Sequence, residues 1–399
     1  MFCIIMVCHG ELARSKPPAR QLTFFYLMVS LGGALGGAFV SFVATKVFPA
    51  YWELQVGMGI ALILVGYTLF RLSDKKNSSK KTERWYFLGK WAWATFSVAI
   101  MVLLLMSMVE TEQETLTTRR NFYGVLRVYE EDKGKESHSR KLYNGQINHG
   151  LQLLWPTEKY RIVSCYSAHS GLGIAFRNHP KRLRAENYES SENFEGADQD
   201  NHLRVGVVGL GIGVIASWGE PSDTFRFYEI NPEVVRIADE FFTVLKESKA
   251  ETKVIVGDGR ISLERELASQ GSMQFDILAV DAFSGDAIPM HLMTREALQL
   301  YFKHLRPDGI LALHISNRHI NLKPVVYGLA ELMDIPALLI KKMRRPEDFI
   351  KGSEWVLMTR NTEFLSAPEV FYYMTPWSSD IRDDIIWTDD YSSLVNVLK

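Results

Sequence analysis

A short apolar run that ends in alternating glycines, RVGVVGLGIG at positions 204–213, decides the fold of this chain. Residues 204–208 have the composition of a buried strand, and Gly209, Gly211 and Gly213 follow that strand directly. Glycine lets the backbone come close to a ligand where a side chain would obstruct it. Such a glycine turn is a weak signal by itself, so its meaning depends on the sequence around it.

Apolar runs and segments of helical character alternate regularly after the glycine turn. Strands that alternate with helices form a mostly parallel sheet covered on both faces. The sequence therefore predicts an α/β domain over 202–399 with a seven-stranded sheet. Its strands are expected at 204–208, 224–230, 253–256, 275–280, 309–316, 335–340 and 355–359.

Carboxylates follow three of these strands, at the edge of the sheet where ligands bind. Glu229 ends the second strand, where a carboxylate can accept both hydroxyls of a ribose. Asp258 follows Gly257 after the third strand and could accept from an adenine amino group, although a turn aspartate explains it equally well. Asp281 directly follows the fourth, buried strand, where an ionisable group is more often functional than structural. Together these residues predict one nucleoside site.

The glycine turn differs from that of the usual dinucleotide enzymes. Val214 follows Gly213, and no third glycine stands at the spacing that cradles a pyrophosphate. A ligand without phosphates, such as an adenosyl sulfonium, fits better. The three cysteines exclude a four-cysteine metal site, and we predict no metal. His149 and His169 are interpreted as solvated or structural.

The first third of the chain has the composition of a membrane region. Residues 22–45, 54–70 and 91–109 contain no charged residue, and each run is close to the roughly 20 residues that cross a bilayer. Buried helices of a soluble protein are the alternative, but those usually carry a polar stripe. We predict a transmembrane region over 1–110, a small β subdomain over 118–180 and a polar loop over 181–201.

Charge gives two further expectations. The 45 Lys and Arg residues balance 46 Asp and Glu residues, which excludes a strongly basic nucleic-acid-binding protein. Basic residues gather at 11–20 and 71–90, and the positive-inside rule places these segments in the cytoplasm. Three spans would then put the α/β domain outside, whereas adenosyl donors are made in the cytosol. The side of the membrane stays open.

Residues 205–317 resemble the spermidine synthase family of aminopropyltransferases, which share a seven-stranded, Rossmann-like fold with S-adenosylmethionine-dependent methyltransferases. CHGELAR at 8–14 and WTDDY at 387–391 resemble bacterial proteins in which membrane helices precede a spermidine-synthase-like domain. The resemblance implies an integral protein of a bacterial inner membrane. It also implies a small-molecule amine acceptor, a lipid bilayer and a homodimer as partners, and no nucleic acid.

The resemblance assigns roles by position. It makes Asp281 the general base of a D-x-x-D loop and Tyr166 the active-site tyrosine. Asn148 stands where the family has a nucleoside-contacting glutamine. Residues of the nucleoside site are then Gly209, Gly211, Gly213, Glu229, Asp258, Gly259 and Asn148.

The chain departs from the family where the amine would bind. Ile212 replaces the aspartate that holds the aminopropyl ammonium, and Ser284 replaces the second aspartate of D-x-x-D. Burying an ammonium without a carboxylate partner is costly. Binding of a diamine should be weakened unless other acids compensate. The substrate-binding candidates are Ser284, Asp286, Asp389 and Asp390.

Three functions stay open at this point. The resemblance implies transfer of an aminopropyl group from decarboxylated S-adenosylmethionine to an amine, with no metal. A methyltransferase that uses S-adenosylmethionine on an unknown acceptor is the second. A non-catalytic, membrane-tethered nucleoside-binding or sensor protein is the third, favoured by the missing amine-binding acids and opposed by the presence of Asp281.

Overall fold

The computed structural model describes residues 2–74, 80–113, 115–189, 201–283 and 288–399. The chain divides into two compact units, Met1–Arg127 and Val128–Lys399. The first unit is helical up to residue 113, with α1 (Phe2–Arg14), α2 (Leu22–Ala38), α4 (Trp52–Asp74) and α5 (Lys80–Gln113). The second unit contains the α/β domain.

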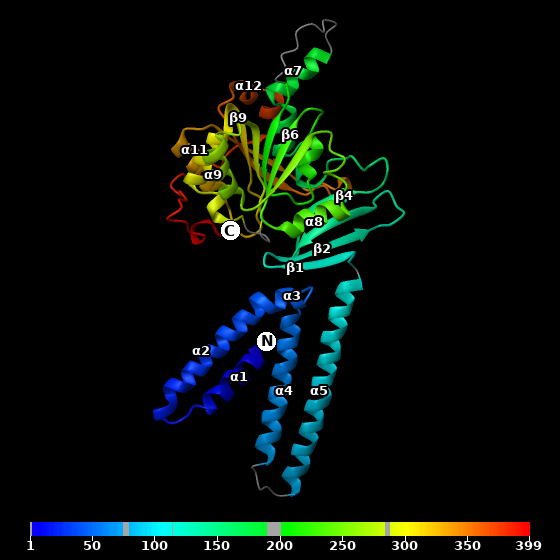
Figure 1. Cartoon of the computed structure of the whole chain (residues 1–399), viewed down its shortest axis with the longest axis vertical. Coiled ribbons are helices and arrows are strands. Elements are labelled where there is room, and N and C mark those ends of the chain that lie inside the picture. The colour runs from blue at the N-terminus through cyan, green and yellow to red at the C-terminus, as the bar shows by residue number, and fades with distance from the viewer. Residues whose placement is uncertain (1, 75–79, 114, 190–200, 284–287) are drawn as a thin grey trace. The chain divides into compact units, whose positions relative to one another are not determined.

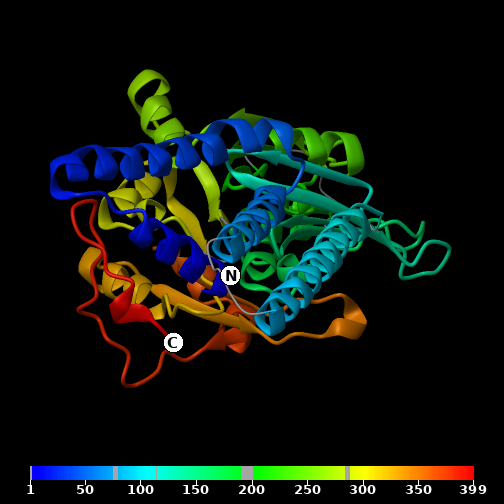
Figure 2. The same ribbon diagram turned by 90° about the horizontal axis from the view of Figure 1, so that it is seen from below.

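One helix of the first unit stands out by its length and composition. A 3₁₀ turn, α2, a π-helical segment and α3 (Thr45–Val47) follow one another as a continuous helix, Ala19–Val47, drawn in dark blue in Figures 1 and 2. It is long and apolar enough to cross a membrane. Trp52–Thr68 and Trp91–Met106 are shorter apolar helices within the part of the chain that the structure describes. All three predicted spans are thus helical, and among the described residues one of them, Ala19–Val47, is both long and apolar enough to cross a membrane.

A four-stranded sheet follows the helices, in the order β1 (Thr117–Asn121), β2 (Gly124–Glu131), β3 (Ser139–Asn144) and β4 (Ile147–Leu153). Gly145, with φ of 60°, turns the chain between β3 and β4. This sheet lies within the predicted β subdomain at 118–180. The same range also holds α6 (Gly171–Arg177), which packs against the large sheet instead.

The large sheet has eight strands in the order β12-β10-β11-β9-β8-β5-β6-β7, as Figure 1 shows in part. Strands β5 to β9 are parallel, and β11 runs antiparallel to its neighbours β9 and β10. The seven predicted strands and the Rossmann-like fold are confirmed, and β12 adds a two-residue edge. Their bounds are β5 Arg204–Val208, β6 Thr224–Glu229, β7 Glu251–Val256, β8 Phe275–Val280, β9 Leu305–His314, β10 Ala337–Lys342, β11 Ser353–Met358 and β12 Met374–Thr375.

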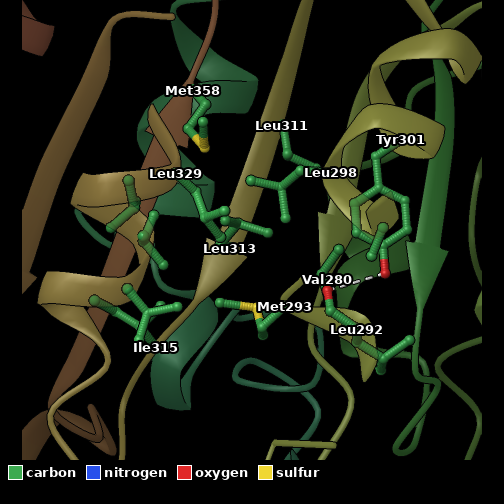
Figure 3. Packing of buried hydrophobic residues seen from close by; sticks show 14 of the residues in the cluster. Val280, Leu292, Met293, Leu298, Tyr301, Leu311, Leu313, Ile315, Leu329 and Met358 are labelled. Carbon is green, nitrogen blue, oxygen red and sulfur yellow. Dashed lines mark hydrogen bonds between the residues drawn. The ribbon is translucent and has the colours of Figure 1, made fainter. Parts of the chain in front are cut away.

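Helices cover both faces of this sheet, which explains why all six residues of β8 are buried. On one face, α10 (Arg295–His304) and α11 (Lys323–Met333) pack on β8 and β9, and Figure 3 shows the interlocked side chains of Leu298, Leu311 and Leu329. On the other face lies α6, where Gly171 contacts Trp355 of β11. The remaining helices are α7 (Pro180–Glu189), α8 (Pro232–Phe241), α9 (Gly259–Gln270), α12 (Thr362–Leu365) and α13 (Pro368–Tyr373).

The polar loop predicted over 181–201 is wrong for its first part, because residues 181–189 belong to helix α7. Lys181 binds the buried carboxylate of Asp276 at 3.0 Å, and Arg182 pairs with Asp223. These ion pairs attach the start of a highly polar segment to the sheet. The composition of the segment gave no sign of these tertiary partners.

The glycine turn requires glycine for steric reasons. Gly209 has φ of 101°, and a Cβ atom there would lie 2.4 Å from the carbonyl oxygen of Asp281. A side chain at this position would push apart the ends of β5 and β8. The absence of a side chain at Gly209 therefore keeps Asp281 against the turn.

We predict that Gly209→Ala destabilises the chain more than Gly271→Ala. Gly271 also has a positive φ, 81°, but a Cβ atom there would meet nothing within 4 Å, so it isolates the backbone effect. The control should cost about 1–3 kcal/mol, because the backbone angles of Gly271, φ of 81° and ψ of −164°, are nearly exclusive to glycine. Overpacking at Gly209 should add on the order of 2 kcal/mol, measured by urea unfolding. Equal losses for the two variants would show that the contact with Asp281 is unimportant.

Candidate active site

The carboxyl ends of four adjacent parallel strands, β8, β5, β6 and β7, form one continuous edge. The backbone N–H of Asp281 donates to Val208 at 2.9 Å, and that of Gly209 donates to Tyr228 at 2.8 Å. Gly257 likewise donates to the carbonyl of Glu229 at 2.8 Å. The residues that follow β8, β5, β6 and β7 therefore lie side by side, as expected for ligand binding at a parallel sheet.

Asp281 is held from two sides. The hydroxyl of Tyr166 donates to its Oδ2 at 2.6 Å, and Nδ1 of His314 lies 2.6 Å from its Oδ1. Burial raises the pKa of Tyr166 well above its usual value, with the charge of Asp281 adding to the effect. The phenol therefore stays protonated and acts as a donor. Both partners fix the orientation of the carboxylate.

His314 is itself fixed by aromatic side chains. Its ring stacks on Trp355 at a centroid distance of 4.4 Å and an angle of 7°. Phe283 meets the ring edge-on at 5.0 Å. The second ring nitrogen, Nε2, lies 2.8 Å from the hydroxyl of Ser316, which accepts the backbone N–H of Glu354 at 2.7 Å. With an ionised Asp281, Nδ1 carries the proton and Nε2 accepts from Ser316.

These groups open into a cavity of about 300 Å³. That volume suits a small ligand. Four of the predicted site residues lie in its wall, namely Asn148, Tyr166, Gly211 and Asp281. His149, Cys165, Phe283, His314, Ser316, Arg318 and Lys351 also line it. The cavity thus joins the glycine turn, the small sheet and the ends of β8 and β9.

The small sheet closes on the glycine turn at Gly211 and Ile212. A Cβ atom at Gly211 would lie 2.4 Å from the carbonyl oxygen of His149, and one at Gly150 would lie 2.5 Å from Ile212. Ile212 is 1% exposed. The position at which the resembled family has an amine-binding aspartate is therefore filled by an apolar contact.

Glu229 lies beside the turn, with its carboxylate already oriented. Its Oε2 accepts from the backbone N–H of Leu210 at 3.0 Å, and its Oε1 accepts from Asn231 at 2.8 Å. Burial raises the pKa of Glu229, and these backbone donors oppose the shift. A carboxylate oxygen can accept a second hydrogen bond, so both oxygens can still receive ribose hydroxyls.

Asp258 has a structural role in addition to any contact with a ligand. Its Oδ1 caps α9 by accepting from Ile261 at 3.0 Å, and its Oδ2 lies 3.0 Å from Nε2 of His291. The hydrogen bond with His291 lowers the pKa of this carboxyl. Gly259 packs against Val208. Neither Asp258 nor Glu229 lines the cavity, so Asp281 is the one of the three predicted carboxylates that does.

The substrate-binding candidates are not brought to the cavity. Asp389 binds Arg260 with both oxygens, at 2.7 and 2.5 Å, and this pair lowers its pKa to about 2. Holding an ammonium there would require breaking that pair. Asp390 is exposed and outside the cavity wall. Ser284 and Asp286 lie outside the described residues.

Sequence reasoning missed His314 and gave His149 no part in the site. His314 ends β9, whose parallel register pairs Leu313 with Val280 of β8, so His314 falls beside Asp281. The signal was a polar residue at the end of an apolar strand, the same argument that singled out Asp281. No group of three or more His, Cys, Asp or Glu side chains among the described residues could hold a metal.

The fold and the site define a Rossmann-type domain with a nucleoside-sized cavity at the carboxyl edge of its sheet. No family model matches the chain. A segment of 111 residues is 35% identical to a polyamine aminopropyltransferase of Vibrio vulnificus, and it covers 27% of this chain and 36% of that relative. The chain is therefore spermidine synthase-like over this segment, which spans little more than a third of the relative's length.

Solved structures show more distant likenesses. A probable spermidine synthase from Corynebacterium glutamicum has a TM-score of 0.43 at 18% identity, covering 63% of this chain and 83% of its own. Spermidine synthase from Thermotoga maritima has a TM-score of 0.40 at 10% identity, covering 69% and 82%. Human methyltransferase-like protein 13 in complex with SAH has a TM-score of 0.33 at 19% identity, covering 45% and 86%.

We predict that His149 makes the stability of the chain fall in mild acid. Burial lowers its pKa from 6.5 to about 4, and its Nε2 has no hydrogen-bond partner within the described part of the chain. Between these pH values the unfolded chain binds more protons than the folded one, so the free energy of unfolding falls as pH falls through this window.

His149→Gln should reduce the slope of the free energy of unfolding against pH by up to about 1.4 kcal/mol per pH unit. The measurement is urea unfolding at several pH values across the window. His319→Gln, at an exposed position, is the matched control and should leave the slope unchanged. An unaltered slope in His149→Gln would mean that this imidazole is protonated normally in the folded chain.

Proposed function

We propose that this chain is a spermidine synthase-like transferase that moves an alkyl group from an adenosyl sulfonium donor to an amine. As the first candidate reaction, the transferred group is aminopropyl and its donor is decarboxylated S-adenosylmethionine. The observation that carries the proposal is the carboxylate of Asp281, held between Tyr166 and His314 in a cavity that reaches the glycine turn. The partial sequence similarity to a polyamine aminopropyltransferase supports it.

The donor would bind along the carboxyl edge of the sheet. Gly209, Gly211 and Gly213 all have positive φ, which glycine adopts readily, and Gly211 lines the cavity. Glu229, beside this turn, would receive the ribose hydroxyls, and Asp258 the adenine amino group. Asn148, in the wall of the cavity, would also contact the donor. Its Oδ1 accepts from the N–H of Gly150 at 2.9 Å, so its amide NH2 group remains available for the ligand.

Asp281 would act on the acceptor. A primary amine has a pKa near 10 and arrives protonated, so it must lose a proton before it attacks. The carboxylate takes that proton, and the nitrogen lone pair forms a bond to the carbon attached to the sulfonium. The carbon–sulfur bond breaks with its electrons going to sulfur, which leaves a neutral thioether. Tyr166 and His314 keep the carboxylate oriented during this step, and positioning supplies much of the acceleration.

A methyltransferase is the second candidate, and one specific observation favours it. Ile212 is buried against Gly150, where an aminopropyl ammonium would need a carboxylate. S-adenosylmethionine carries its transferable methyl group on the same sulfonium. The products separate the two candidates, because aminopropyl transfer releases methylthioadenosine and methyl transfer releases S-adenosylhomocysteine.

We also propose that residues 1–110 anchor the transferase in a bilayer, with the chemistry carried by 118–180 and 202–399. The continuous helix Ala19–Val47 supports this, because only 6% of its apolar stretch is buried inside the structure. Phe24, Leu27 and Phe42 are each more than half exposed. An apolar helix with so little cover needs lipid or a partner around it.

The full chain should therefore stay with the membrane fraction after an alkaline carbonate wash. Replacing Leu27 and Leu31 by Lys in that helix should release a substantial share of the protein, because a lysine at the centre of a span costs about 3 kcal/mol. Lys substitutions at the exposed residues Leu332 and Val395 of the second unit are the matched control and should not change the distribution. Recovery of the wild-type chain in the soluble fraction would exclude the anchor.

Asp281→Asn should reduce turnover by about 100-fold to 10,000-fold while the affinity for methylthioadenosine stays within about twofold of wild type. Turnover is followed as methylthioadenosine released from decarboxylated S-adenosylmethionine over a panel of amines, and affinity by calorimetric titration. The control Asp334→Asn changes an exposed carboxyl at the end of α11, in a left-handed conformation that asparagine tolerates. Equal loss of turnover and affinity in a folded Asp281→Asn chain would contradict a role as base.

A further inference from the structure

A second pocket adjoins the cavity of the proposed active site. It is open, has a volume of about 280 Å³, and shares Ser316, Asn317 and Gly352 with the cavity. Because the same residues form part of both walls, the second space lies directly beside the cavity that contains Asp281. We call it the basic pocket, after Lys341, Lys342 and Arg344 in its wall.

The basic pocket carries more positive charge than the protein neutralises. Its wall contains one acidic side chain, Glu354, whose Oε1 is bound by Lys323 at 2.9 Å and by Lys341 at 3.3 Å. No ion pair of Lys342 or Arg344 occurs within the residues that the structure describes. Two cations of the pocket therefore lack an anionic partner.

The surroundings of Lys342 also disfavour its charge. Partial burial lowers the pKa of its ammonium, and the nearby positive charge of Arg345 acts in the same direction, while the charge of Asp348 opposes the shift with a smaller effect. An anion in the basic pocket would relieve this repulsion. A second cation would increase it.

The cavity itself has the same imbalance. Among the residues that the structure describes, Asp281 is the one carboxylate in its wall, and both of its oxygens are already engaged by Tyr166 and His314. Lys351 lines the same wall. The far ammonium of a diamine whose near end lies at Asp281 could thus meet the Lys351 ammonium, and like charges at short range disfavour a ligand.

We propose that the acceptor is an amine that carries an anionic group, phosphate or carboxylate, at its other end. This inference rests on the proposed transferase function and names its substrate class. The amine lies at Asp281, and the anionic end lies on Lys342 and Arg344 in the basic pocket. The reaction is the alkyl transfer given above, in which the anionic group binds and undergoes no change.

The test compares four amines as acceptors for the full chain: phosphoethanolamine, γ-aminobutyrate, butylamine and putrescine. Wild-type protein should use at least one of the two anionic amines with a higher kcat/KM than putrescine. Comparison of the phosphate and carboxylate probes shows which anionic group the pocket prefers. A preference for putrescine would overturn the inference, and the release of methylthioadenosine in that assay would leave the proposed function standing.

Lys342→Gln/Arg344→Gln should lower the ratio of kcat/KM for the anionic amine over butylamine by at least about tenfold, mainly through KM. The matched control is Lys303→Gln/Arg204→Gln, which removes the same two charge types from exposed positions at the opposite edge of the sheet, where α10 ends and β5 begins. The control should keep the wild-type ratio. An unchanged ratio in the pocket variant would overturn the inference.

A binding measurement covers the case in which no amine is turned over. Phosphoethanolamine is titrated calorimetrically into the full chain saturated with methylthioadenosine, for wild type and for both double variants. Binding that is lost only in Lys342→Gln/Arg344→Gln supports the anionic subsite even though the transferase proposal fails. No binding to wild type overturns the subsite as well.

Discussion

The carboxylate of Asp281, held between a tyrosine and a histidine, is the constraint on which the site depends. The two partners come from distant parts of the chain, Tyr166 before the α/β domain begins and His314 at the end of β9. Their meeting requires the parallel register of β8 and β9, the stacking of His314 on Trp355, and a glycine at 209. A buried carboxylate needs such partners, because burying its charge without them would favour the neutral acid.

The surroundings of this carboxylate divide the site into two halves of different character. The half at the glycine turn contains Glu229, whose carboxylate is oriented by the backbone N–H groups of Leu210 and Asn231. The half toward Lys351 and the basic pocket is positively charged. Lys351 in the wall of the cavity, with Lys342 and Arg344 in the basic pocket, is the basis of the proposed preference for an acceptor with an anionic end.

Much of the α/β domain could be predicted from local sequence. The seven strands were found because β8 and its neighbours are short apolar runs at regular spacing, and Asn231-Pro232 starts a helix as its chemistry indicates. The prediction of a loop at the start of α7 is wrong because it rests on the high charge of the segment. Lys181 and Arg182 are neutralised by carboxylates that lie elsewhere in the chain. The composition of a segment gives its charge, but it does not show which distant residues neutralise that charge.

The sequence by itself determined the alternating α/β architecture and the positions of Glu229, Asp258 and Asp281 at strand ends. These follow from periodicity and from the rule that parallel strands present their carboxyl ends at one edge. Tertiary structure alone decided that Asp281 faces the cavity with Tyr166 and His314, that Asp389 is occupied by Arg260, and that Lys342 and Arg344 line a pocket beside the cavity. Hydrogen bonds and charge pairs depend on distances of a few ångströms between residues far apart in the chain, and no local pattern encodes those distances.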